Sequence, residues 1–109
     1  MSVALYAWQR ATAALMAPLV LVHLVVIFYA MGTGLSAAQI LARTRGSMAW
    51  GLFYVVFVAA VSIHAAIGVR TILIEWTPLP RRAIDWIVIL FGLVLAGLGL
   101  RAVAAVVLP

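Results

Sequence analysis

The chain has 109 residues, of which 69% are hydrophobic and 8% are charged, and its formal net charge is +5. With a mean hydropathy of +1.32, this composition excludes a soluble globular domain. In a membrane chain, the excess of arginine concerns orientation and anionic groups at the interface, and it does not indicate nucleic acid as a partner. The sequence has no cysteine, which excludes disulfides and iron–sulfur ligation by thiolates.

Three apolar runs are each long enough to cross a hydrocarbon core, which takes about 20 helical residues. They predict an all-α membrane protein, a single module over residues 1–109 with transmembrane helices at about 11–31, 50–75 and 85–108. Three helices share one seam, so the rest of their surface must meet lipid or protein. A cofactor buried in this module would therefore lie against a partner chain.

The segments that connect these runs also carry structural signals. Ser36 is a suitable N-cap for a short interfacial helix that ends before Gly46. Pro78 and Pro80 predict a rigid turn, and Asp85 is the expected start of the last helix. The last helix offers small residues for close packing, namely Gly92, Ala96, Gly97 and Gly99. Four arginines on one side and three on the other leave the orientation undecided.

Two histidines, His23 and His64, lie alone inside the first and second apolar runs, with no carboxylate or lysine within a helical turn. Ionisable side chains at such depth usually face a bundle interior and mark a function. Axial ligation of haem iron is the chemistry that most often needs an isolated intramembrane imidazole. The alternative is a histidine that only hydrogen-bonds a neighbouring helix.

Helix geometry indicates that the two histidines differ in depth. At about 1.5 Å per residue, His23 lies roughly 20 Å along its helix from Arg10, and His64 lies roughly 9 Å from Arg70. Arg10 and Arg70 belong to the same membrane side, so the histidines differ in depth by roughly 10 Å. Two imidazoles on one iron need nitrogens about 4 Å apart. We expect each histidine to require its own partner ligand from another chain.

The stretch Gln9–Ala13 (QRATA), the stretch 62–68 (SIHAAIG) and the pair Glu75–Trp76 occur in this order on three helices. In this arrangement the chain resembles the small cytochrome b membrane anchor subunits of succinate dehydrogenase and fumarate reductase. The resemblance spans nearly the whole chain, and it implies that the module forms half of a larger helical bundle with a partner anchor chain. It implies one or two haem b groups shared with a second membrane anchor subunit, and quinone as a substrate.

The resemblance also implies roles for matching positions. His64 matches an axial haem ligand, and His23 matches the helix I histidine of relatives with two haems. Arg10 matches an arginine near the haem propionates and the quinone, although interfacial arginines also extend to the membrane surface without such a role. Glu75 and Trp76 match an Asp–Tyr pair at the quinone site, but the tryptophan here cannot perform phenol chemistry.

Two further residues have both a cofactor interpretation and a structural one. Gly68 would allow close approach of the haem or of a neighbouring helix. Arg70 could neutralise a haem propionate or extend to the membrane surface, and together with Glu75 it is a candidate for guiding protons.

The resemblance thus implies a non-catalytic subunit of an oxidoreductase complex in a bacterial cytoplasmic membrane. It would join an iron–sulfur subunit, a flavoprotein subunit and the second anchor subunit, and would pass electrons between clusters and quinone. One alternative is a haem-free structural anchor or assembly subunit. Another is a small oligomeric transporter, but such proteins commonly carry an intramembrane carboxylate, which the first two apolar runs lack.

Overall fold

The computed structural model describes residues 2–109 and contains four helices. They are α1 (Val3–Thr33), α2 (Ala37–Thr44), α3 (Met48–Trp76) and α4 (Arg81–Val107), and no strand occurs among the described residues. The three long helices are each long and apolar enough to cross a membrane. The structure therefore confirms the all-α membrane fold class.

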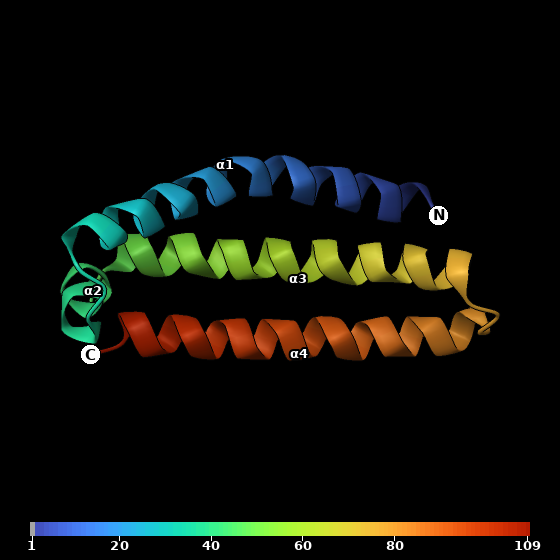
Figure 1. Cartoon of the computed structure of the whole chain (residues 1–109). Helices are drawn as coiled ribbons and strands as arrows, with labels where there is room; N and C mark the ends of the chain where they lie inside the picture. The colour runs from blue at the N-terminus through green and yellow to red at the C-terminus, as the bar shows by residue number, and fades with distance from the viewer. Residues whose placement is uncertain (1) are drawn as a thin grey trace.

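The three long helices pack with α3 in the central position (Figure 1). Helix α3 contacts both α4 and α1, and the short helix α2 packs against α4. The N-terminus and the turn between α3 and α4 lie at one end of the bundle, whereas α2 and the C-terminus lie at the other (Figure 1). The arrangement places the start of α1 beside the end of α3.

Serine side chains cap the N-termini of three of the four helices. Ser2 and Ser47 accept hydrogen bonds from the backbone N–H groups of Leu5 and Trp50, which satisfies donors that a helix start leaves free. Ser36 and Gln39 form a reciprocal capping box at α2. The short helix is thus present with the expected cap, and Gly46 follows it at φ 73°, a conformation that favours glycine.

The expected starts of the first and last long helices were wrong. Helix α4 begins at Arg81, directly after Pro80, because a proline at a helix start loses no hydrogen bond and has a suitable φ. Asp85 lies inside α4 and pairs with α3 instead of starting the helix. Helix α1 likewise begins at Val3, ahead of the apolar run, since residues 3–10 contain no helix breaker.

Glycines allow α3 and α4 to approach closely. A Cβ added at Gly99 would lie 2.6 Å from Val58 Cγ1, and one at Gly92 would lie 3.3 Å from Ala66 Cβ. By contrast, a Cβ at Gly97 would meet nothing within 4 Å. The predicted small-residue surface of the last helix therefore divides: Gly92 and Gly99 face α3, while Gly97 does not.

Helix α2 and the residues that follow it are hydrogen-bonded to the C-terminal end of α4. Thr44 is 6% exposed and donates from Oγ1 to the carbonyl of Val106 at 2.6 Å. The N–H of Gly46 donates to the carbonyl of Val107, also at 2.6 Å. These two bonds satisfy carbonyls at the C-terminal end of α4, which have no partner within their own helix.

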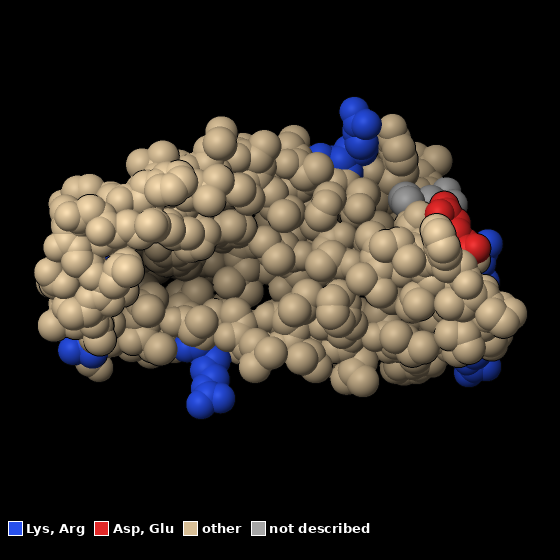
Figure 2. Space-filling view, in the orientation of Figure 1, with Lys and Arg blue, Asp and Glu red and all other residues tan. Residues whose placement is uncertain are grey.

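Little of the apolar surface is buried within the chain itself. The buried hydrophobic residues among those described are Ala30, Ala60, Ile67, Ile84, Val88 and Val103. Many large apolar side chains on all three long helices are exposed. In the space-filling view most of the surface is uncharged; blue side chains lie at both ends, two more project between the ends and the middle, and the red ones lie at one end (Figure 2). Lipid or partner protein must cover this uncharged surface.

Candidate functional site

His64 faces α1 and is held there by a hydroxyl. Its Nδ1 lies 3.1 Å from Oγ1 of Thr12, a residue that is 4% exposed. Thr12 Oγ1 also lies 2.7 Å from the carbonyl oxygen of Trp8 in its own helix. Sequence patterns do not predict this partner, because Thr12 and His64 are 52 residues apart and meet only when α1 packs on α3.

The other ring nitrogen of His64 remains available. The side chain is half-buried, and Nε2 makes no hydrogen bond with any described residue and is not among the enclosed unpaired atoms. A histidine that ligates a metal usually binds through one nitrogen and uses the other in a hydrogen bond that fixes the ring. His64 has this arrangement.

His23 has different surroundings. It packs edge-on against Tyr54 and Phe57 of α3, with ring centroids 6.0 and 5.4 Å away. Its Nδ1 is enclosed and has no hydrogen-bond partner among the described residues. Beside it lies a cavity of about 240 Å³. A buried nitrogen without a hydrogen-bond partner costs free energy, which distinguishes His23 from His64.

The two histidines belong to separate places on the α1–α3 interface. His23 contacts Phe57, which lies seven residues before His64 on α3, a rise of about 10 Å. This separation matches the depth difference expected from the sequence. A nitrogen of His23 and a nitrogen of His64 cannot bind the same iron in this conformation, because two such nitrogens must lie about 4 Å apart.

Gln9 lies one helical turn before Thr12 and faces Gly68. Its Oε1 is enclosed without a partner among the described residues, and a Cβ added at Gly68 would lie 3.6 Å from its Nε2. In this structure, then, the group that approaches Gly68 is the Gln9 side chain of a neighbouring helix. Gln9 and Thr12 both belong to the QRATA stretch, but their polar contacts could not be read from it.

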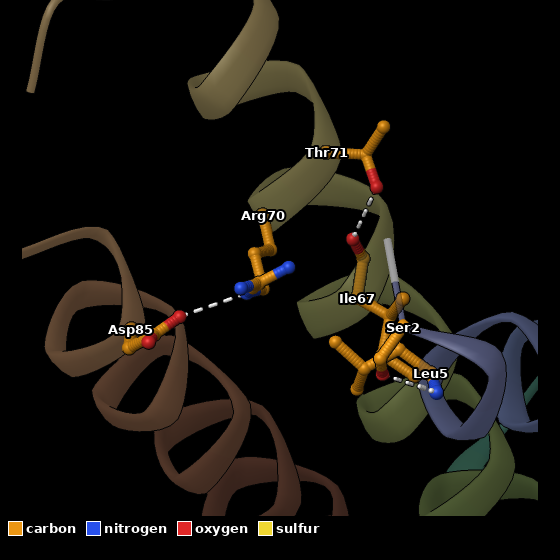
Figure 3. Close-up of polar contacts among 6 residues, drawn as sticks. All are labelled: Ser2, Leu5, Ile67, Arg70, Thr71 and Asp85. Carbon is orange, nitrogen blue, oxygen red and sulfur yellow. Dashed lines mark hydrogen bonds and ion pairs between the residues drawn. The ribbon is translucent and has the colours of Figure 1, made fainter. Parts of the chain in front are cut away.

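Arg70 is paired with Asp85. Its Nε donates to Asp85 Oδ1 at 2.8 Å, and the close-up shows the guanidinium extending from α3 toward α4 (Figure 3). The pair borders an apolar groove of about 670 Å³ between these helices, which Ser62 also lines. Ser62 is 6% exposed and points away from His64, as expected from its position two residues earlier.

The remaining predicted site residues are exposed at the end of the bundle that holds the N-terminus. The guanidinium of Arg10 lies 5.8 Å from the ring centroid of Tyr6. Glu75 and Trp76 end α3, where Trp76 is 81% exposed. Their side chains make no hydrogen bond or ion pair with residues 2–109. Arg70 therefore pairs with Asp85 and not with Glu75.

The described residues contain no group of three or more histidine, aspartate or glutamate side chains that could hold a bare metal ion. One imidazole can still ligate a metal whose other donors come from a macrocycle or from a second chain. The site residues fit that case: one ring with a free Nε2, set in an apolar helix interface.

Comparison with known proteins gives one match. Residues 1–99 match the profile of the family described as Succinate dehydrogenase/Fumarate reductase transmembrane subunit. No curated protein and no solved structure matches the chain.

Proposed function

The chain belongs to the family of succinate dehydrogenase/fumarate reductase transmembrane subunits, and from this premise we propose that it is a cytochrome b anchor subunit. Haem b, when bound, supplies a one-electron centre between the iron–sulfur clusters of a soluble subunit and quinone in the membrane. The chain itself would ligate the haem, orient it and exclude water from it. Succinate chemistry would belong to the flavoprotein subunit, and the residues of this chain would serve the haem and the quinone.

The observation that carries the proposal is the environment of His64. Its ring is fixed through Nδ1, while Nε2 is free of hydrogen bonds with the described residues. An apolar interface of this kind gives the low-dielectric, water-poor surroundings that an axial haem ligand needs. His64 would thus hold a haem b, and the second membrane anchor subunit would supply a further ligand.

His23 is the proposed ligand of a second haem, farther from the soluble subunits. Support comes from its separation from His64 and from the enclosed, unpaired Nδ1. A further ligand of this haem would come from the partner anchor chain, because no second histidine of this chain lies close enough to share the iron. The large exposed apolar surface of the long helices leaves ample area for such a partner.

Quinone is proposed to bind at the end of the bundle that carries Arg10, Glu75 and Trp76. Arg10 and the indole N–H of Trp76 can donate hydrogen bonds to quinone carbonyl oxygens, and Glu75 can exchange protons with water. All three side chains are exposed in this chain, so a complete pocket requires walls from the other subunits. Arg70 is already neutralised by Asp85, and its remaining N–H groups are those left for a haem propionate.

The competing function is a haem-free structural anchor or assembly subunit, in which both histidines serve packing. An optical spectrum and a pyridine haemochrome count on the purified complex separate the two. The cytochrome proposal expects b-type Soret and α bands and one or two haems per complex. Absence of these bands in an assembled complex would leave only the structural anchor.

A further inference from the structure

The hydroxyl of Thr12 lies at the centre of a group of hydrogen-bonding atoms that includes His64. Thr12 Oγ1 has three neighbours within hydrogen-bond distance: the Trp8 carbonyl oxygen at 2.7 Å, the Gln9 carbonyl oxygen at 3.1 Å and His64 Nδ1 at 3.1 Å. A threonine hydroxyl has one proton to donate and two lone pairs to accept with. The three neighbours therefore compete for a single proton.

Geometry assigns that proton to the backbone of α1. Carbonyl oxygens only accept, and 2.7 Å is the usual length of a good O–H···O bond. Threonine hydroxyls inside helices commonly donate back to a carbonyl one turn earlier. When the Thr12 hydroxyl donates its hydrogen bond to the Trp8 carbonyl oxygen, Oγ1 can only accept a hydrogen bond from His64. Nδ1 of His64 must then be the donor.

We infer that Thr12 is a positioning residue that holds His64 as the Nδ1–H tautomer and thereby leaves the Nε2 lone pair free for a metal. A neutral imidazole carries one ring proton, so a proton on Nδ1 leaves Nε2 unprotonated. The same bond limits rotation of the ring, because Thr12 is 4% exposed and anchored to its own helix. The donation from Thr12 to Trp8 also polarises Oγ1 and strengthens it as an acceptor.

His23 provides an internal contrast. Its Nδ1 is enclosed but has no acceptor among the described residues, so this chain alone does not set its tautomer. The inference about the haem rests on the proposed function, whereas the tautomer of His64 is a property of the chain itself. The two parts are tested separately.

The tautomer is measured by ¹⁵N NMR of the full chain, labelled at its histidine rings and reconstituted without haem in lipid bicelles. We expect a pyrrole-type Nδ1 and a pyridine-type Nε2 for His64, identified by their loss in His64→Ala. Thr12→Val keeps the shape and removes the hydroxyl, so both nitrogens should move toward averaged shifts. Thr12→Ser should restore the wild-type pattern. A protonated Nε2 in the wild type, or a pattern unchanged by Thr12→Val, overturns the inference.

The role toward haem is measured on the purified complex. Loss of a hydrogen-bond partner behind a metal ligand typically weakens metal binding by about 10- to 100-fold, so Thr12→Val should retain haem that much less tightly. The iron that remains should show a more positive midpoint potential and an altered low-spin EPR signal, because its ligand donates less strongly. Thr12→Ser should restore all three properties.

The outcomes distinguish the two ideas. If NMR finds the Nδ1–H tautomer but Thr12→Val leaves haem retention, potential and EPR signal unchanged, the positioning role is wrong. If the wild-type complex holds no haem, the cytochrome proposal fails, and the NMR result alone decides the tautomer. If the Thr12→Val chain failed to fold, the tautomer measured in the wild-type chain would still test the inference.

Discussion

Arg70 of α3 and Asp85 of α4 form an ion pair with an Nε–Oδ1 distance of 2.8 Å. The Arg70 side chain is 17% exposed and that of Asp85 is 47% exposed, so the pair is intermediate between a surface and a buried one. Asp85→Ala should lower the free energy of unfolding by about 1–3 kcal/mol, because it leaves a half-buried guanidinium without its partner. Reversible SDS unfolding in mixed micelles would measure this change.

Glu75→Ala is the matched control for the ion pair. It removes a carboxylate from the same end of the bundle, but one that is exposed and has no partner among the described residues. Its effect should stay within about 0.5 kcal/mol. Equal losses from the two variants would show that the pair stabilises nothing beyond general charge balance.

Replacement of His64 tests the proposed haem ligand. His64→Ala should abolish one low-spin b-type haem signal per complex or convert it to high spin, because iron would lose an axial imidazole. Optical and EPR spectra of the purified complex would report the change. An unchanged low-spin spectrum in a fully assembled variant would rule out His64 as a ligand.

Replacement of His23 tests the second haem. His23→Ala should reduce the pyridine haemochrome count by one per complex and leave the His64 haem spectrum intact, because the two rings lie about 10 Å apart along the bundle. The competing view, a histidine that only hydrogen-bonds another helix, assigns it about 1–2 kcal/mol of packing. A wild-type complex with one haem, or a variant that keeps two, would favour that view.

Membrane orientation can be measured with introduced cysteines, since the chain has none. Leu79 lies in the turn between α3 and α4 and is 43% exposed, and Leu35 precedes α2 and is 63% exposed. We expect an impermeant thiol reagent to label Leu79→Cys only from the cytoplasmic side, where the soluble subunits would dock, and Leu35→Cys only from the opposite side. The reverse pattern would exclude docking at the turn.

Two glycines of α4 form a matched pair for the helix seam. Gly99→Ala should destabilise the bundle by about 1–3 kcal/mol, because the new Cβ would lie within 3.3 Å of Cβ and both methyl carbons of Val58, a β-branched side chain that cannot rotate away. Gly97→Ala meets nothing within 4 Å and should be neutral or stabilising by up to about 1 kcal/mol. SDS unfolding of both variants would test this difference.

Hydropathy predicted the three long helices but not all of their ends. Apolar runs locate the part of a helix that lies in lipid, whereas the helix itself continues into polar flanks until its hydrogen bonds are capped. Ser2 and Pro80 therefore define the starts of α1 and α4, ahead of the apolar residues. Asp85 resembled an N-cap, but its carboxylate pairs with Arg70, a contact between helices that local signals do not encode.

The candidate histidines could be found from the sequence, but their partners could not. A polar residue stands out in an apolar run, so His23 and His64 were evident. Helices that are apolar on every side carry no periodic signal of which face meets a neighbour. The rotation of α1 about its axis, which brings Thr12 to His64 and Gln9 to Gly68, is set by packing and is visible only in the structure.

The fastening of α2 to the end of α4 has a consequence for biosynthesis. Thr44 and Gly46 bond to the carbonyls of Val106 and Val107, which lie at the C-terminal end of α4. Synthesis runs from the N-terminus, so α2 is made before the carbonyls that accept its hydrogen bonds. These two hydrogen bonds can form only after α4 has been made and has packed. A chain truncated within α4 would therefore leave the loop accessible to proteases.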